Sequence, residues 1–199
     1  MEKWEIQDKT VEFDEETHAY LVDGVIVPSC TQILKAKFRD MYKGISESTL
    51  KRASERGTQV HEAIELYCKT KEPELLVQDE VRGFNFLCRA YDLTPLSNEV
   101  PLLLCEDGKP IVAGRMDLLL NDRERFAIGD IKTTSTLNKD YLAYQLNLYR
   151  VAFEQSYGMD IEALYGFHLR EHKRKLVEIP INDFIVKEIL ELYREELSK

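Results

Sequence analysis

Gly114-Arg115-Met116-Asp117 and, after a short polar turn, Asp130-Ile131-Lys132 form the stretch that decides the fold of this chain. Apolar residues dominate on both sides of the turn, which is typical of two paired strands covered on both faces. Side chains opposite each other on one face of such a hairpin lie about 4.5–5.5 Å apart. The expected register sets Asp117 directly opposite Asp130. The predicted segments are the strand 111–120, the turn 121–125 and the strand 126–132.

Two facing carboxylates repel each other, and a divalent cation between them reverses the sign of that interaction. Lys132 follows Asp130 by two residues and therefore lies on the same strand face. Mg²⁺ and Mn²⁺ prefer oxygen ligands, which Asp117 and Asp130 supply, and the carbonyl of Ile131 adds another. We expect Lys132 to orient or deprotonate a water molecule, with a pKa that the nearby cation lowers. The stretch thus predicts a site for metal-assisted phosphodiester hydrolysis.

The composition is that of one globular domain over residues 1–199, with 44% hydrophobic and 32% charged residues. No apolar run approaches the roughly 20 residues that a membrane helix needs, so we expect no membrane contact. The acidic start, Met1-Glu2-Lys3-Trp4-Glu5, is unlike a signal or transit peptide and favours a cytoplasmic protein. Four dispersed cysteines without a CxxC pair predict reduced core thiols rather than a zinc or redox motif. They are Cys30, Cys68, Cys88 and Cys105.

The net charge of −9 argues against a general nucleic-acid coat protein. Two basic clusters occur in the chain despite its net negative charge. Residues 35–56 carry seven basic and three acidic side chains, a net of +4, and residues 170–175 oppose four basic side chains with Glu171 alone. Each cluster is either a solvated face or a track for phosphate groups. The candidate DNA-binding residues are Lys51, Arg52, Arg56, Arg170, Lys173 and Arg174.

Local signals predict the remaining elements. Asp23-Gly24 predicts a hairpin turn, and Ser29 with Gln32 predicts a capping box that opens a helix. Gly57 is expected to break a helix in two, and Asn182 is expected to cap the last helix. The expected helices cover 30–37, 48–69, 76–91, 139–157 and 182 to about 197, and the further strands cover 18–22, 25–27, 99–105, 163–169 and 176–179.

The motifs resemble the PD-(D/E)XK nuclease superfamily, and most of all its RecB-like exonuclease branch. The centre of the resemblance is Gly-x-x-Asp followed by Asp-x-Lys across a hairpin. That branch also carries a helical histidine upstream, matched by His61, and Gln-x-x-x-Tyr downstream, matched by Gln145 and Tyr149. The stretch 27–32 resembles the opening of phage-type and mitochondrial-maintenance-type members, so the resemblance spans roughly residues 20–170.

The resemblance implies an α/β fold with a restriction-endonuclease-like core, in which helices flank a central mixed sheet in αβββαβ order. It implies an N-terminal hairpin and helical elaboration over about 1–95, a catalytic core over about 96–180 and a closing helix over about 182–198. It further implies a Mg²⁺- or Mn²⁺-dependent DNA nuclease, above all an exodeoxyribonuclease of recombination, repair or phage DNA processing, encoded by a bacterium or a phage. The alternatives are a structure- or sequence-dependent endonuclease and a non-catalytic nucleic-acid-binding accessory subunit. Relatives include toroidal oligomers and nuclease domains tethered to helicases, so a protein partner or a homo-oligomer also stays open.

The resemblance also implies roles for single residues. Asp117 and Asp130 correspond to the metal-binding carboxylates, and Lys132 corresponds to the catalytic lysine. His61 corresponds to an additional metal ligand. Gln145 and Tyr149, which share one helix face, correspond to residues that hold the lysine or the substrate phosphate.

Some of these residues also have plainer interpretations. His61 alone is consistent with a helix-face histidine, Tyr149 with a core aromatic, and Glu99 with either an outer carboxylate of the site or a strand-end glutamate. Met116 precedes Asp117 where the superfamily name has proline, although the branch commonly uses Gly-x-x-Asp. Some RecB-like relatives hold an iron–sulfur cluster through four cysteines, three of them near the C-terminus. This chain has no cysteine after Cys105, which predicts no cluster.

Overall fold

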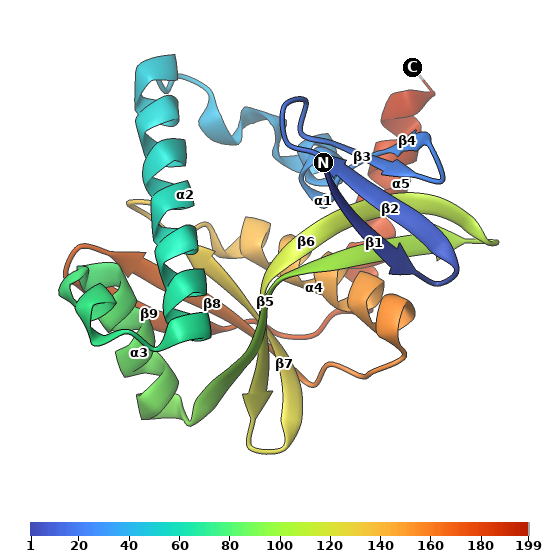
Figure 1. Cartoon of the computed structure of the whole chain (residues 1–199). Coiled ribbons are helices and arrows are strands. Elements are labelled where there is room, and N and C mark those ends of the chain that lie inside the picture. Colours follow the sequence, from blue (N-terminus) through green and yellow to red (C-terminus); the bar gives the residue numbers. More distant parts are fainter. Residues whose placement is uncertain (199) are drawn as a thin grey trace.

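Two sheets organise the computed structural model, which describes residues 1–198 (Figure 1). The larger sheet is mixed: β7 and β8 are parallel, whereas its other neighbouring strands are antiparallel. A parallel pair needs a long crossover connection, and α4 (Lys139–Tyr157) supplies it. In spatial order the strands are β5 (Leu93–Glu106), β6 (Lys109–Asp122), β7 (Arg125–Lys132), β8 (Ala163–Arg170) and β9 (Lys173–Glu178).

Helices cover both faces of this sheet, as the apolar character of its strands predicts. Helices α1 (Cys30–Phe38), α4 and α5 (Asp183–Leu197) pack on one face around Ile128 and Leu164. Helices α2 (Glu47–Thr70) and α3 (Asp79–Tyr91) pack on the other face around Ala127 and Phe167. Because successive strand residues point to opposite faces, one strand feeds both cores.

The second sheet lies over the far end of the long β5–β6 hairpin (Figure 1). It is antiparallel in chain order and shares a small core with Leu103 and Ala113 of the hairpin. Its strands are β1 (Glu2–Ile6), β2 (Lys9–Asp14), β3 (Ala19–Val22) and β4 (Val25–Val27). Two short 3₁₀ helices, η1 (Arg39–Tyr42) and η2 (Pro73–Val77), complete the described chain.

Several local predictions are confirmed. Ser29 and Gln32 form the capping box of α1, and Asn182 caps α5. Asp23 and Gly24 make the β3–β4 turn with positive φ at both residues, as a two-residue hairpin requires. None of the helices within residues 1–198 combines the length and apolarity that a membrane span requires.

Other predictions need correction. Gly57 does not divide a helix, because α2 runs unbroken through it. A Cβ atom at Gly57 would lie 3.6 Å from Thr133, so the glycine sits where α2 approaches the loop after β7. The helix expected from residue 76 begins at Asp79, after η2. Glu99 is not at a strand end, because β5 begins six residues earlier, and the first two strands of the chain were not predicted.

Candidate metal and catalytic site

Asp117, on β6, is linked to β7 by a hydrogen bond that its side chain accepts. The ladder of the β6–β7 hairpin runs from Asp122 opposite Arg125 to Leu118 opposite Gly129. Continuing this register by one residue sets Asp117 opposite Asp130, as predicted, but the backbone ladder ends before that pair. The Oδ2 atom of Asp117 instead accepts a hydrogen bond of 2.6 Å from the backbone N–H of Ile131. The carboxylate therefore continues the pairing where the two strands separate.

Asp130 is a fully buried carboxylate paired with Lys132. Its side chain is 1% exposed, and the Lys132 Nζ atom lies 2.5 Å from its Oδ2 atom. Apart from this ammonium, neither Asp130 oxygen has a hydrogen-bond partner among residues 1–198. A buried carboxylate normally accepts several donors. Asp130 therefore has oxygen lone pairs free for a further electrophile.

His61 connects α2 to the same strand. Its Nε2 atom lies 3.1 Å from the carbonyl oxygen of Ile131. Since a carbonyl only accepts, Nε2 carries the proton of this bond. The other ring nitrogen, Nδ1, lies 3.6 Å from Oδ2 of Asp117. The Ile131 carbonyl, predicted as a metal ligand, is thus engaged by an imidazole that was predicted to be a ligand itself.

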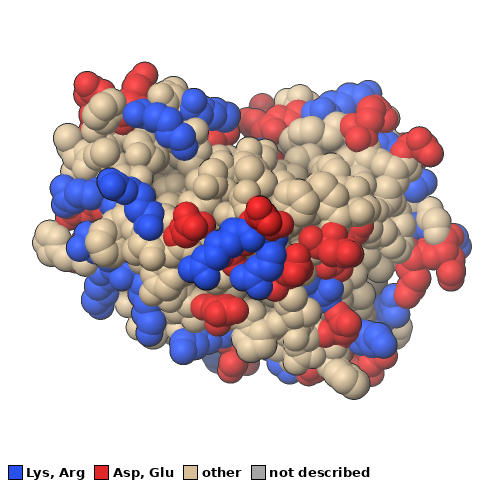
Figure 2. Space-filling view, turned by 90° about the horizontal axis from the view of Figure 1, so that it is seen from below, with Lys and Arg blue, Asp and Glu red and all other residues tan. Residues whose placement is uncertain are grey.

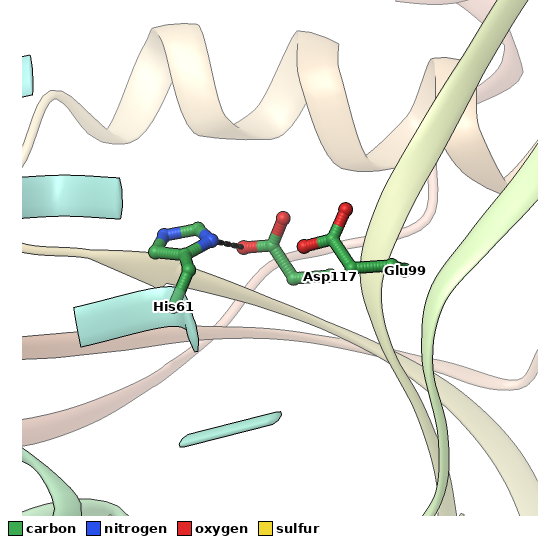
Figure 3. A group of neighbouring side chains, drawn as sticks. All are labelled: His61, Glu99 and Asp117. Carbon is green, nitrogen blue, oxygen red and sulfur yellow. Dashed lines mark ion pairs between the residues drawn. The ribbon is translucent and has the colours of Figure 1, made fainter. Parts of the chain in front are cut away.

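Glu99 completes a three-residue cluster with His61 and Asp117 (Figure 3). One potential ligand atom from each residue lies within 4.8 Å of the other two. The imidazole and both carboxylates point toward one another from α2, β5 and β6. Within residues 1–198, Glu99 is the one strand residue other than glycine with a positive φ, 49°. Such local strain concentrates at functional sites.

Burial and neighbouring charges together set the pKa values of these groups. Burial raises the pKa of Glu99 to about 7, and the neighbouring Asp117 carboxylate adds to the effect. Burial also raises the pKa of Asp130. The Lys132 ammonium opposes this shift, and the Asp117 carboxylate adds to it. For Lys132, burial lowers the pKa, but the Asp130 and Asp117 carboxylates outweigh it and raise the pKa above its usual range. Lys132 is therefore an ammonium ion in the metal-free protein.

The downstream pair lies on the buried face of α4. The Gln145 amide donates a hydrogen bond of 3.0 Å to the Tyr149 hydroxyl, and the Gln145 carbonyl oxygen has no partner among residues 1–198. Burial raises the pKa of Tyr149 well above its usual range, and the Asp130 and Asp117 carboxylates add to the shift. Tyr149 is thus within electrostatic reach of both carboxylates.

Two neighbours of the site were missed by sequence reasoning. The Nε atom of Arg115 lies 3.5 Å from Glu99, and its Nη1 atom bonds Glu2 at 2.8 and 2.9 Å. Tyr141 lies one helical turn before Gln145. Burial raises the pKa of Tyr141 to about 12, and the nearby Lys132 ammonium opposes this shift. Arg115 lies inside the quoted motif, and the i, i+4 spacing of Tyr141 to Gln145 was the available signal for it.

The predicted DNA-binding residues have different surroundings. Arg56 is held by Glu80 and Glu171, and Arg170 lies 3.6 Å from Glu171. The Lys51 ammonium lies 4.0 Å from Glu55, and Arg52 donates to the Ser48 carbonyl. Lys173 and Arg174 are exposed on the edge strand β9, where the Arg174 guanidinium stacks over Phe86. Arg56, on α2, therefore links this helix to Glu80 of α3 and to Glu171 of the β8–β9 turn, and it is not a free cation.

The residues present fit a divalent cation. Octahedral Mg²⁺ holds its ligands at about 2.1 Å, so neighbouring and opposite ligand atoms are about 3.0–4.2 Å apart. The cluster of His61, Glu99 and Asp117 needs only a small contraction to reach these separations. The hydrogen bond from His61 Nε2 to a backbone carbonyl is the arrangement that orients a metal-binding histidine. Asp130, whose carboxylate has Lys132 as its one partner among residues 1–198, lies next to the cluster on β7.

Comparisons with known proteins add little. No family model and no curated protein matches the chain. A solved structure described as "Crystal structure of SSO0001" is similar over 86% of this chain and 75% of that chain, with a TM-score of 0.47 and 16% identity. A likeness at this level carries no argument about activity.

Proposed function

We propose that this protein is a Mg²⁺- or Mn²⁺-dependent DNA nuclease, and specifically an exodeoxyribonuclease acting in recombination, repair or phage DNA processing. The observation that carries the proposal is the buried Asp130 carboxylate, which has the Lys132 ammonium as its one partner among residues 1–198. It lies one residue from the backbone carbonyl that His61 contacts. Burying a carboxylate with a single partner costs stability, which favours a role in binding a cation over a structural role.

The metal would be held by His61, Glu99, Asp117 and Asp130, and when bound it would neutralise phosphate charge and acidify a water molecule. The protein's own groups would do the rest. Lys132, held by Asp130, would face the substrate phosphate as an ammonium and orient the attacking water. The buried Gln145–Tyr149 pair would exclude water near Asp117 and Asp130 while placing polar groups there. The oxygen of the attacking water would bond to phosphorus as the ester P–O bond breaks. The water's proton would pass to bulk water, and the leaving oxygen would take a proton from bulk water.

The chain order is compatible with a restriction-endonuclease-like core. Helix α3, strands β5, β6 and β7, helix α4 and strand β8 follow one another along the chain, and in this proposal they supply the αβββαβ core. In this proposal, residues 96–180 form the core, residues 1–95 elaborate it and α5 closes it. Because the net charge is −9, we infer that DNA binds through local basic surfaces or with help from a protein partner or a second copy of the chain.

The test is cleavage of end-labelled DNA with Mg²⁺ or Mn²⁺ by the full chain. Asp130→Asn and Lys132→Met keep the shapes of the side chains, and each should lower the rate by about 10²-fold or more. Asp160→Asn and Lys187→Met are matched controls on exposed positions away from the cluster. Cleavage that persists unchanged in the first pair would place the chemistry elsewhere.

The form of the DNA separates the alternatives. An exonuclease leaves closed circular DNA intact and degrades linear DNA from its ends. Cutting of the closed circle would establish the endonuclease alternative. DNA binding without any turnover in either metal would establish the non-catalytic accessory subunit.

A further inference from the structure

A basic groove lies between α3 and the edge strand β9, apart from the residues of the metal cluster. It has a volume of about 580 Å³ and is lined by Arg82, Asn85, Phe86, Arg89, Ala90 and Arg174. Lys and Arg side chains gather on the left-hand part of the face in Figure 2, the side where Figure 1 has α3 and β9. Three arginines around one groove are unusual in a chain with a net charge of −9.

The periodicity of α3 builds one wall of the groove. Val81, Phe84 and Leu87 are buried against the sheet, which leaves the opposite face of the helix in solvent. Arg82, Phe86 and Arg89 recur there at i, i+4 and i+7, so the two arginines are two turns apart, about 10 Å along the axis. The helix wall therefore carries a cation, an aromatic ring and a second cation in a row.

Strand β9 supplies the second wall at close range. A Cβ atom at Gly83 would meet the Arg174 and Leu169 side chains at 3.4 Å, so the glycine lets α3 lie close to the strand. The Arg174 guanidinium carbon then lies 4.2 Å from the centre of the Phe86 ring. Phe86 is nevertheless 48% exposed. A large aromatic ring left half in solvent, with a guanidinium over it, is a ready stacking surface.

The charges of the groove are only partly compensated. Arg82 pairs with Asp79, which also has His172 at 3.1 Å. Within residues 1–198, neither Arg89 nor Arg174 has a carboxylate at ion-pair distance. The other acidic side chain at the start of α3, Glu80, is engaged by Arg56. Two guanidinium groups without a carboxylate partner, that of Arg89 and that of Arg174 over the Phe86 ring, therefore face the groove.

We infer that this groove binds a segment of single-stranded nucleic acid, with phosphates on Arg89 and Arg174 and a base stacked on Phe86. Guanidinium forks match phosphate oxygens, and an exposed aromatic ring accepts any base on its face. The Asn85 amide, also in the groove, can hydrogen-bond a base edge. An acidic peptide would pair with the arginines but would leave the Phe86 ring without a stacking partner. In a duplex the bases are stacked on one another and cannot stack on Phe86. The choice of ligand rests on the proposed nuclease function, but its test does not need cleavage.

The experiment measures fluorescence anisotropy of fluorescein-labelled oligothymidylate with the full chain in EDTA, across a salt series. The double charge reversal Arg89→Glu with Arg174→Glu should weaken binding on the order of tenfold or more. It should also reduce the salt slope by about 1.4, as loss of two single-strand phosphate contacts requires. Phe86→Ala, which leaves the charge unchanged, should weaken binding on the order of tenfold with an unaltered slope.

Lys109→Glu with Lys187→Glu changes the net charge equally on exposed positions elsewhere and should retain most of the affinity. Equal affinity and slope in the wild type and the Arg89→Glu, Arg174→Glu protein would overturn the inference, as would the absence of wild-type binding. Displacement of the oligonucleotide by polyglutamate at equal charge concentration would reassign the groove to acidic peptides. Should the double reversal fail to fold by circular dichroism, Phe86→Ala and Arg89→Gln decide the question. The cleavage test changes Asp130 and Lys132 instead, so each idea can fail without the other.

Discussion

The imidazole of His61 bonds the backbone carbonyl of Ile131, the residue between Asp130 and Lys132, across 70 positions of sequence. This contact fixes one ring nitrogen as a donor and directs the other toward Asp117 at 3.6 Å. The second nitrogen then either carries a proton and pairs with Asp117 or offers its lone pair to a cation between them. The arrangement therefore couples α2, β6 and β7 through one side chain.

Replacement of His61 should weaken metal binding far more than folding. In His61→Phe, one hydrogen bond of about 1 kcal/mol is lost, which lowers the Tm of the metal-free protein by about 2–4 °C. Added Mn²⁺ should raise the wild-type Tm, because an ion that binds only the folded state stabilises it. The variant should need at least 10–100-fold more Mn²⁺ for the same shift. Differential scanning fluorimetry over a Mn²⁺ series measures both effects. His172→Phe, at an exposed position, is the control, and an equal Mn²⁺ response in His61→Phe would remove His61 from the metal site.

Removal of the buried Glu99 charge, which also lies beside Asp117, should stabilise the metal-free protein at alkaline pH. The folded-state pKa of Glu99, about 7, is above the ordinary value of 4.5, so the folded state retains the proton longer than the unfolded state. This residue's contribution to stability is present below about pH 4.5 and is lost as the pH rises through about 7. Because glutamine does not ionise, the Glu99→Gln protein should not lose this stability as the pH rises. Its Tm should match the wild type near pH 5 and exceed it near pH 8 by a few degrees.

Mn²⁺ should reverse that order, since the wild type gains a ligand that the variant lacks. Thermal melts of both proteins in EDTA and in Mn²⁺ at two pH values test this. Glu191→Gln, on the exposed side of α5, controls for the loss of one charge. A Tm difference between Glu99→Gln and wild type that is the same at both pH values would show that Glu99 does not titrate in this range.

Gly114 of the Gly-x-x-Asp motif is needed for packing. A Cβ atom there would lie 2.9 Å from the Cys30 sulfur, because α1 lies directly against β6. Gly114→Ala should therefore destabilise the fold by about 1–3 kcal/mol through overpacking. Urea denaturation followed by circular dichroism measures the change. The double variant Gly114→Ala with Cys30→Ala should recover part of the loss, and an unaltered urea midpoint in Gly114→Ala alone would contradict the contact.

The ion pair between Arg56 and Glu80 should stabilise the fold only above acidic pH. Although burial opposes it, the backbone N–H of Glu171 and the Arg56 guanidinium lower the pKa of Glu80 below its usual 4.5. The stabilisation is therefore fully present above pH 4.5 and is lost as the pH falls through the lower folded-state pKa. Glu80→Gln should cost about 1 kcal/mol at pH 7 and progressively less as the pH falls below 4.5. Urea midpoints at pH 7 and in acid measure this, and a cost that is independent of pH would mean that the charge of Glu80 is unimportant.

Much of the local structure could be read from the sequence. The limits of α4, Lys139 and Tyr157, and the register of the β6–β7 turn are those expected from short-range signals. Gly57 misled the prediction because an isolated glycine often ends a helix, whereas here the burial of Val60 and Ile64 sustains α2. Strands β1 and β2 were missed because their polar, alternating residues become a sheet only when Val11 and Phe13 pack on the β5–β6 hairpin.

The sequence by itself determined the order of strands and main helices from β3 onward and the β6–β7 register that leads Asp117 toward Asp130, because hairpin register and strand periodicity depend on neighbouring residues. Only the tertiary structure decided how these groups are used: Asp117 bonds the Ile131 amide, His61 bonds the Ile131 carbonyl, and Glu99 enters the cluster through a left-handed backbone. The His61 contact joins residues 70 positions apart, and it follows from the way α2 packs on the sheet. No local pattern encodes that packing, because it depends on the shape and burial of the whole core.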